Sequence, residues 1–190
     1  DNTAQIWNAE TGRPQGAPLR HPDWVTFVRF SPDGKLLATA SRDGVARLWE
    51  VATGQVVGAG FHHEKWINTV EFSPDGKWLL TASDDQTARV WEAATGKPVT
   101  PEPLRHRHNV RVAGFSPDGR TVATISADRT ARIWDAATGA PRTPPLRHEG
   151  ILTVMQFSPD GRWLATGGFD RLVRIWRVAN GELQCPPLRH

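Results

Sequence analysis

The sequence predicts an all-β repeat fold in which small antiparallel sheets stack face to face. Three observations support this prediction. A phrase of thirty residues, HPDWVTFVRFSPDGKLLATASRDGVARLWE over 21–50, recurs with substitutions but no gaps over 63–92, 106–135 and 148–177. A tryptophan stands near the end of each copy, and successive tryptophans are 42 or 43 residues apart. Each copy contains short strand-like runs separated by turn signals. A repeat of this length indicates a solenoid or a propeller.

The first twenty residues match only the second half of a unit. They contain a strand, TAQIW over 3–7, a turn at Thr11 and Gly12, and an outer stretch that ends in PLR. The first whole unit then reads as four strands over 25–30, 35–41, 45–50 and 55–60. In the connecting phrase SPDG, proline presets the first turn dihedral and Asp and Gly suit the next positions, which favours a hairpin.

The second strand of each unit carries small or apolar residues on both faces, as in KLLATAS over 35–41. We expect neighbouring sheets to cover both of its faces. The outermost strand is expected at QVVGAG, GKPVTPEP, GAPRTPP and GELQCPP. These runs are poor in strand formers and mostly rich in proline, which is typical of a sheet edge that must not recruit another strand.

These patterns predict one repeat domain over 1–190. A partial blade over 1–20, which supplies the two outer strands, precedes four blades over 21–62, 63–105, 106–147 and 148–190. The chain starts within a repeat at Asp1 and its one methionine is Met155, so we expect a fragment or processed product of a longer protein.

Composition disfavours several classes of partner. Lys and Arg total 23 against 20 Asp and Glu, a net charge of +3, and the basic residues are scattered. This balance disfavours nucleic acid and anionic membranes. The one cysteine, Cys185, excludes a disulfide within the chain and suits a reducing compartment, so we expect a cytoplasmic protein. No apolar run approaches the roughly 20 residues of a membrane span, and we expect no signal peptide.

The repeated phrase resembles the WD40-repeat family of β-propellers over the whole chain. A histidine opens each unit, an aspartate stands six residues before each tryptophan, and Trp-Asp closes one unit at Trp134 and Asp135. The residue before each histidine is Arg or His and never the family's Gly, and Asn, Glu or Arg follows the other tryptophans. PLRH and FSPDG look like bacterial members of the family.

The resemblance implies a buried network in each blade that runs from the tryptophan N–H through a hydroxyl to the histidine and on to the aspartate. The hydroxyl is expected from the threonine four residues before the aspartate, because the alternative series Ser41, Ser83 and Ser126 fails at Gly168. The expected network residues are Asp1, Trp7, His21, Thr39, Asp43, Trp49, His63, Thr81, Asp85, Trp91, His106, Thr124, Asp128, Trp134, His148, Thr166, Asp170, Trp176 and His190.

The same His, Ser or Thr, and Asp set has the composition of a nucleophilic triad. A catalytic site needs one exposed nucleophile beside oxyanion donors, whereas this set is repeated four times without a Gly-rich elbow, so we expect no enzyme activity. Metal binding by His62 and His63, or by His106 and His108, lacks an accompanying carboxylate or cysteine cluster. No phosphate-binding loop is present, and we expect no cofactor and no metal.

A partner surface is expected where the units differ, because positions common to all units serve the shared fold. The resemblance places this surface on the rim formed by the loops before each first strand and the turns between the second and third strands. Exposed Trp, Phe and Arg dominate interface energetics, although Trp24 and Trp66 could instead only cover the central opening. The candidate residues are Trp24, Thr26, Arg42, Trp66, Asn68, Asp84, Asn109, Arg111, Ala127, Ile151, Thr153 and Phe169.

The expected function is a non-catalytic protein interaction scaffold, the adaptor or sensor part of a larger bacterial signalling protein that the resemblance pairs with kinases or signalling NTPases. The alternatives are a propeller fragment that closes a ring by oligomerisation and a reader of nucleic acid or modified peptides. A closed ring of five blades would need about 20 further residues, and propellers usually have four to eight blades. We therefore expect another copy or a missing segment to complete the ring.

Overall fold

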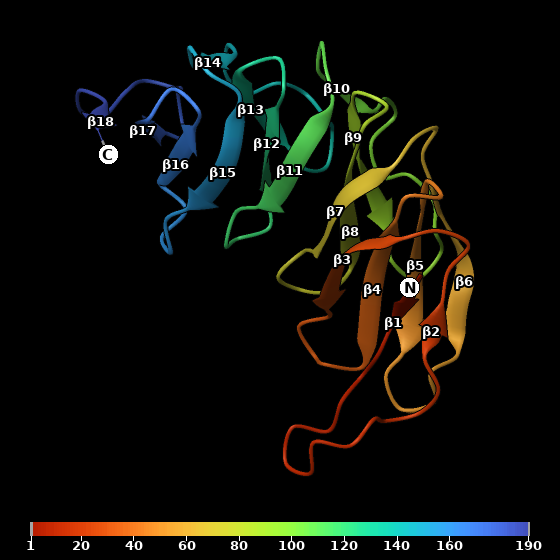
Figure 1. Cartoon of the computed structure of the whole chain (residues 1–190). Coiled ribbons are helices and arrows are strands. Elements are labelled where there is room, and N and C mark those ends of the chain that lie inside the picture. Colours follow the sequence, from red (N-terminus) through yellow and green to blue (C-terminus); the bar gives the residue numbers. More distant parts are fainter. Residues whose placement is uncertain (1, 190) are drawn as a thin grey trace.

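A computed structural model describes residues 2–189 as an all-β structure of one two-stranded and four four-stranded antiparallel sheets (Figure 1). The two-stranded sheet pairs β1 (Thr3–Ala4) with β2 (Leu19–Arg20). The four blades follow in chain order. The first contains β3 (Val25–Phe30), β4 (Leu36–Ser41), β5 (Val45–Glu50) and β6 (Val56–His62), and the second β7 (Ile67–Phe72), β8 (Trp78–Ser83), β9 (Thr87–Glu92) and β10 (Leu104–Arg105). The third contains β11 (Val110–Phe115), β12 (Thr121–Ser126), β13 (Thr130–Asp135) and β14 (Leu146–Arg147), and the fourth β15 (Leu152–Phe157), β16 (Trp163–Gly168), β17 (Leu172–Arg177) and β18 (Leu188–Arg189).

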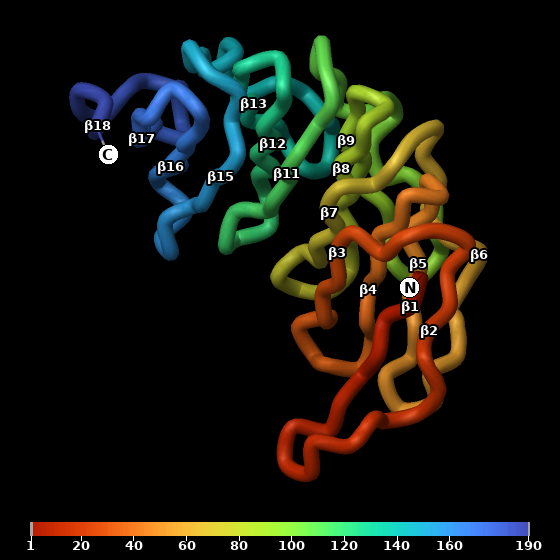
Figure 2. Tube along the Cα trace, in the orientation of Figure 1, coloured from red at the N-terminus to blue at the C-terminus, as the bar shows by residue number. Residues whose placement is uncertain are grey.

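The blades follow one another along an open arc, with the two ends of the chain far apart (Figure 2). The first strand of each blade lies on the concave side of the arc, so β3, β7, β11 and β15 neighbour one another in turn (Figure 1). This arrangement is a propeller architecture, one of the two that the repeat period indicated and the one that the family resemblance implied. No helix occurs among residues 2–189. No helical segment in this range could therefore cross a membrane.

The SPDG phrase forms the same turn in every blade. In the first blade the Ser31 hydroxyl donates to Asp33 Oδ1 at 2.7 Å, and the same oxygen accepts the Lys35 backbone N–H at 3.1 Å. Ser31 Oγ accepts the Leu36 backbone N–H at 2.9 Å, which closes the hairpin between β3 and β4. Gly34 has a φ of 70°, a backbone angle that glycine adopts without strain. The predicted hairpin is present at this phrase, and side-chain hydrogen bonds as well as turn propensity stabilise it.

The outer edge differs from the sequence prediction in three of the four blades. Only β6 is a long outer strand. In the other blades the proline-rich runs form single bridges, at Pro98, Pro141 and Leu183, and the outer strand itself is the later pair of residues Leu-Arg. The residue after each bridge donates one backbone bond to the third strand, as Val99 N–H does to Val90 O at 2.8 Å, whereas Pro98 and Pro141 themselves donate none.

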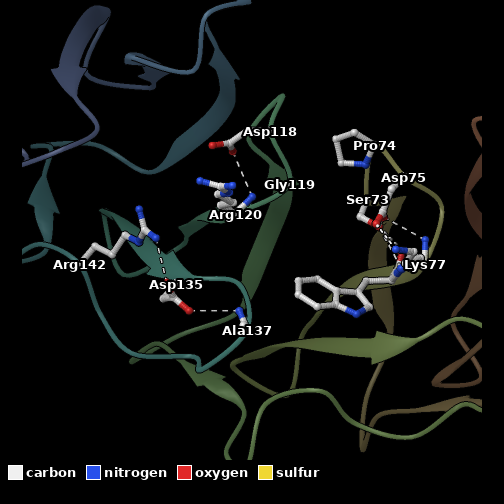
Figure 3. Close-up of a pocket in the computed structure, with 11 residues that line it drawn as sticks. Ser73, Pro74, Asp75, Lys77, Asp118, Gly119, Arg120, Asp135, Ala137 and Arg142 are labelled. Carbon is white, nitrogen blue, oxygen red and sulfur yellow. Dashed lines mark hydrogen bonds and ion pairs between the residues drawn. The ribbon is translucent and has the colours of Figure 1, made fainter.

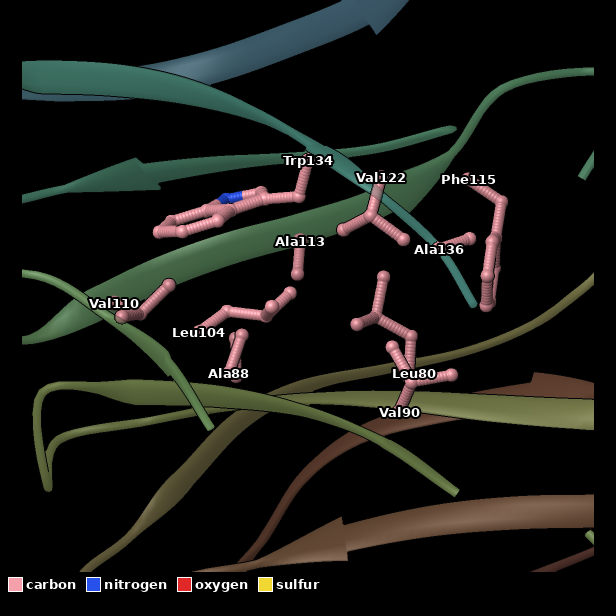
Figure 4. Packing of buried hydrophobic residues seen from close by; sticks show 11 residues of the cluster. Leu80, Ala88, Val90, Leu104, Val110, Ala113, Phe115, Val122, Trp134 and Ala136 are labelled. Atoms are coloured by element: carbon pink, nitrogen blue, oxygen red, sulfur yellow. The ribbon is translucent and has the colours of Figure 1, made fainter. Parts of the chain in front are cut away.

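The hydrophobic core lies between blades. At the junction of the second and third blades, Leu80, Ala88 and Val90 pack against Val122 and other residues of the third blade, with Trp134 in the same cluster (Figure 4). The other two junctions repeat this arrangement. Each blade therefore presents its tryptophan face to the preceding blade and a face of alanines with larger aliphatic residues to the following one. Both faces of strands such as β8 and β12 are buried as expected.

The outward faces of the first and last blades are not fully covered by a neighbouring blade. Ile6 and Leu19 of the partial blade pack against Leu37 and Trp49 of the first blade, but only on its outer part. On the inner part Val28 and Phe30 are 47% and 50% exposed, whereas Val70 and Phe72, which hold the same positions in the second blade, are 0% and 5% exposed. On the last blade Val154 and Leu188 are also exposed.

Candidate functional site

The second blade contains the complete chain of hydrogen bonds that the resemblance implied. Trp91 Nε1 donates to Thr81 Oγ1 at 2.9 Å, and Thr81 Oγ1 lies 2.7 Å from His63 Nε2. His63 Nδ1 lies 2.7 Å from Asp85 Oδ2. With the histidine proton on Nδ1, every group in the series donates to the next one and no buried atom is left without a partner. The arrangement ties β9, β8, the loop before β7 and the turn after β8 together.

The third blade repeats these bonds. Trp134 Nε1 donates to Thr124 Oγ1 at 2.8 Å, and His106 connects Thr124 at 2.7 Å with Asp128 at 3.0 Å. Burial would raise the pKa of the Asp128 carboxyl, but hydrogen bonds from His106 and Thr130 outweigh burial and hold the pKa well below its usual range. In the second blade His63 and Thr87 do the same for the pKa of Asp85.

In the fourth blade an arginine enters the network. Trp176, Thr166, His148 and Asp170 are spaced as in the other blades. Here, however, Arg174 Nη1 lies 2.7 Å from His148 Nδ1 and also contacts Asp170 Oδ2. Burial lowers the pKa of His148, and the Arg174 charge lowers it further. Burial would raise the pKa of Asp170, but Arg174 and other donors lower it to about 2.

The first blade departs from the prediction at His21. Trp49 donates to Thr39 at 2.9 Å, but neither ring nitrogen of the buried His21 has a hydrogen-bond partner. Its expected partner Asp43 forms an ion pair with Arg47 at 2.8 Å instead. Burial lowers the pKa of His21, and the Arg47 charge adds to this effect. The imidazole packs against the Trp49 ring, with centroids 5.3 Å apart.

A threonine missed in the sequence distinguishes the second and third blades from the first and fourth, in which an arginine pairs with the turn aspartate. Thr87 and Thr130 donate to Oδ1 of Asp85 and Asp128, both at 2.6 Å. At the same position the first and fourth blades have Val45 and Leu172, which cannot donate. In those two blades the arginine two residues further on, Arg47 or Arg174, pairs with the aspartate. The alternation of Thr with Val or Leu was visible in the sequence as a signal for this difference.

The predicted network residues near the two ends of the chain form no complete series of hydrogen bonds among the described residues. Trp7 is 61% exposed, because the described residues contain no threonine strand beside it, and it forms only a backbone bridge to Pro14. Its predicted burial in a network is therefore wrong. Asp1 and His190 lie outside the described residues.

The network holds the strands of each blade together and contains no accessible nucleophile among the described residues. The side chains of Thr81 and Thr124 are fully buried, and the histidines beside them are enclosed by the same bonds. The histidine pairs considered for a metal are not brought together, because His63 and His106 point into these networks while His62 approaches Ala59 O and His108 accepts from Asn109 N. Within residues 2–189 no group of three His, Cys, Asp or Glu side chains is placed to hold a metal ion.

The second predicted site consists of the twelve candidate partner-binding residues and is here called the variable rim. In every blade a backbone hydrogen bond joins the loop before the first strand to the turn after the second strand. The backbone N–H of the residue before each turn aspartate donates to the carbonyl of the residue three after the histidine that opens each unit, at 2.9 to 3.0 Å. The pairs joined in this way are Arg42 with Trp24, Asp84 with Trp66, Ala127 with Asn109, and Phe169 with Ile151. Along the arc the rim therefore changes from aromatic and charged to small and then apolar.

The aromatic end of the variable rim is a stack across two blades. The Arg42 guanidinium lies 4.4 Å from the Trp24 ring centre and 4.3 Å from the Trp66 ring centre. Trp24 is 57% exposed and Trp66 is 46% exposed, so neither is a core residue. A depression of about 300 Å³ adjoins Trp66 and is lined by Glu64 and Asp84 among others. The guanidinium lies within cation–π distance of both indoles and connects them across the two blades.

Two other rim candidates are engaged in contacts between blades. The Thr26 hydroxyl donates to Ile67 O at 2.5 Å, and Asn68 Nδ2 donates to Val110 O at 2.9 Å and to Asp84 Oδ1 at 2.8 Å. The equivalent residues Arg111 and Thr153 have no such bond to the following blade among the described residues. At the far end of the rim Phe169 is 70% exposed.

Comparison with known proteins identifies the repeats. The family profile described as WD domain, G-beta repeat (WD40) matches residues 13–50, 54–92, 102–135 and 144–177, together well over half of the chain. The chain is 51% identical over 43 residues to a coronin-like protein of Saccharomyces cerevisiae, 23% of this chain and 6% of that protein. It is 46% identical over 39 residues to Ribosome assembly protein 4 of S. cerevisiae, 20% of this chain and 8% of that protein. These matches span less than a tenth of the relatives' length.

Two solved structures share the architecture. The computationally designed Ika8 protein superposes with a TM-score of 0.89 and 23% identity over 100% of this chain and 57% of that chain. The computationally designed Ika4 protein superposes with a TM-score of 0.79 and 23% identity over 88% of this chain and 99% of that chain. At this identity the likeness concerns the fold alone.

Proposed function

This chain belongs to the WD40-repeat family of β-propellers, and on that premise we propose that it is a non-catalytic scaffold whose variable rim binds another protein or a peptide. The observation that carries the proposal is the Trp24–Arg42–Trp66 stack. Both indoles are about half exposed, and the arginine between them keeps them in place before any partner arrives. A preformed set of Trp and Arg side chains costs less conformational entropy on binding than mobile ones.

The proposal assigns the hydrogen-bond networks to stability and the variable rim to recognition. Trp24, Arg42, Trp66 and Phe169 are the candidate contact residues. We assign Thr26 and Asn68 to support of the rim, because each bonds to the following blade. We further propose that the chain is the adaptor or sensor part of a larger cytoplasmic signalling protein of bacterial type; the repeat phrases SPDG and PLRH support this assignment.

The test replaces Trp24 and Trp66 together with alanine and measures capture of partners from an extract of the source cells. We expect the captured proteins to be lost while the melting temperature stays within a few degrees, because exposed substitutions usually change stability by less than about 0.5 kcal/mol. Replacement of Val56 and Val57, two exposed residues of the outer strand β6, by alanine is the control and should leave that capture unchanged. Unfolding of the Trp24 and Trp66 variant would instead assign these side chains to the core.

A second candidate function is assembly through the ends of the arc. Val28 and Phe30 are about half exposed on the first blade, Trp7 is 61% exposed on the partial blade, and Val154 is 61% exposed on the last blade. Faces of these two types pack on each other at the three internal junctions. The β1–β2 sheet already covers the outer part of the first blade, so the inner part has room for two strands of another copy or of a further segment of the protein.

Sedimentation velocity of the chain tests this second candidate. We expect a concentration-dependent oligomer that Phe30→Lys or Val154→Lys disrupts without lowering the stability of the monomer, because both side chains are exposed within one copy. Val70→Lys is the control, since Val70 is fully buried and its replacement should unfold the protein. A compact monomer at every concentration would exclude assembly through these ends.

A further inference from the structure

The rim opposite the variable rim carries a cleft at each junction between blades, lined by the SPDG turns and by the ends of the second and third strands. The first cleft, between the first and second blades, has a volume of about 510 Å³, the second about 430 Å³ and the third about 320 Å³. Figure 3 shows the second cleft, where Asp135 of the third blade pairs with Arg142. Because the three clefts occupy equivalent places, they can be compared directly.

The charge of these clefts changes along the arc. One lysine and two carboxylates line the first cleft, and three basic and three acidic side chains line the second. The third cleft is lined by Arg142, Arg162 and Arg177 and by one carboxylate, Asp118. The third cleft is therefore the most basic of the three, although the chain as a whole carries only +3.

One position, at which the charge is reversed in the fourth blade, accounts for much of the difference in charge between the clefts. The residue after each structural tryptophan pairs across the sheet with the first residue of the second strand, and these pairs are Leu36 with Glu50, Trp78 with Glu92, Thr121 with Asp135, and Trp163 with Arg177. In the first three blades the acid accepts a hydroxyl bond from the threonine of the following turn. In the fourth blade Arg177 replaces the acid, and Asn180 replaces that threonine.

Arg177 has unused hydrogen-bond donors. Its guanidinium lies 5.1 Å from the Trp163 ring centre, and among residues 2–189 it has no carboxylate partner. Arg142 and Arg162 each use one nitrogen, on Asp135 at 2.8 Å and on Asp160 at 2.6 Å. A guanidinium offers five N–H donors in a planar fork that matches a carboxylate or a phosphate, so each of the three can bind a further oxygen.

We propose that the third cleft binds an anionic side chain of a peptide, a carboxylate or a phosphorylated hydroxyl, with Arg177 as the main contact and Arg142 and Arg162 beside it. Trp163 supplies an apolar wall for the carbon atoms of the same side chain. A cleft of about 320 Å³ fits one or two side chains. A nucleic acid would require a row of basic residues along its backbone, and the other two clefts do not continue such a row.

Fluorescence anisotropy with a labelled hexaglutamate peptide at low ionic strength tests the proposal, and a phosphoserine peptide forms a second arm that separates carboxylate from phosphate. We expect salt-sensitive binding of at least one peptide, no binding of a hexaglutamine peptide, and an affinity at least about tenfold lower in Arg177→Glu. This variant should fold, because Glu50 and Glu92 hold the same position in other blades. Arg177→Gln, which removes the charge without reversing it, should show an intermediate loss.

A converse variant tests whether the same arrangement creates binding of the acidic peptide in another blade. Glu92→Arg places an arginine opposite Trp78 in the second blade, as Arg177 stands opposite Trp163, and it should increase binding of the acidic peptide. The proposal is overturned if neither anionic peptide binds the natural chain, if Arg177→Glu binds as well as the natural chain, or if a single-stranded oligonucleotide of equal charge binds more tightly than both peptides. These outcomes are independent of the variable rim, because Trp24 and Trp66 do not line the third cleft.

Discussion

Replacement of Thr81 by valine should destabilise the protein about twice as much as the same replacement of Thr39. Both threonines are fully buried, and both accept the N–H of the tryptophan of their own blade at 2.9 Å. Thr81 also bonds to His63 at 2.7 Å, whereas the ring nitrogens of His21 have no partner. Valine has nearly the shape of threonine, so the lost hydrogen bonds dominate the difference.

The magnitudes follow from counting the buried atoms left without a partner. Each such atom costs about 1 to 3 kcal/mol. Thr81→Val leaves Trp91 Nε1 and His63 Nε2 unpaired, which predicts a loss of about 2 to 6 kcal/mol in unfolding free energy. Thr39→Val leaves only the Trp49 N–H unpaired, which predicts about 1 to 3 kcal/mol. The weak contacts of the two hydroxyls with Arg47 O and Arg89 O are alike and cancel in the comparison.

Urea unfolding followed by tryptophan fluorescence measures the two free energies. Because repeat proteins can unfold in stages, hydrogen exchange of the β4 and β8 amides reports the loss blade by blade. Equal losses for the two variants would refute the reasoning, because they would mean that the histidine contributes nothing in the second blade or is bonded in the first.

Three further predictions concern the same turns and histidines. His21→Leu should change the unfolding free energy by less than about 1 kcal/mol, whereas His63→Leu should lower it by about 2 to 4 kcal/mol because Thr81 and Asp85 lose a partner; equal effects in urea titrations would contradict this. The pKa values of His21 and His148 are lowered in the folded protein, so below the ordinary value of 6.5 the unfolded chain binds more protons, and stability should fall between about pH 7.5 and about pH 5.5. His21→Leu should reduce that slope, and an unchanged slope would argue against burial as its cause. Gln86 has a φ of 73°, so Gln86→Gly should raise the unfolding free energy by about 0.5 kcal/mol; a lower melting temperature would contradict this.

The strands and the main hydrogen-bond series could be predicted because each repeats four times. A threonine found in every copy four residues before an aspartate identifies the bonding hydroxyl more firmly than the serine series that Gly168 interrupts. The exception at His21 could not be predicted from the sequence, because the fourth blade also lacks the threonine two residues after the aspartate and His148 still bonds to Thr166 at 2.8 Å. It is seen only in the structure, where Arg47 pairs with Asp43 and the ring nitrogens of His21 have no partner. A repeat pattern therefore predicts the hydrogen bonds that the copies share, but it does not show which single copy lacks one of them.

Contacts between blades were the least predictable part of the site. Trp24 and Arg42 belong to one unit and Trp66 to the next, and the sequence gives no distance between them. Their stack depends on how far each blade is rotated from its neighbour. For the same reason the interblade bonds of Thr26 and Asn68 could not be distinguished in advance from partner contacts.

The two faces of a blade are unlike, and every internal junction joins a tryptophan face to a face of alanines with larger aliphatic residues. A cut in the loop between the second and third blades would therefore create two half-molecules with fresh surfaces of opposite kind. Mixed in solution, these halves should reassociate in one orientation only, with Val122 and Trp134 again seated on Leu80 and Val90. The molecule is in this sense directional, and repeats can be joined to it in tandem but not back to back.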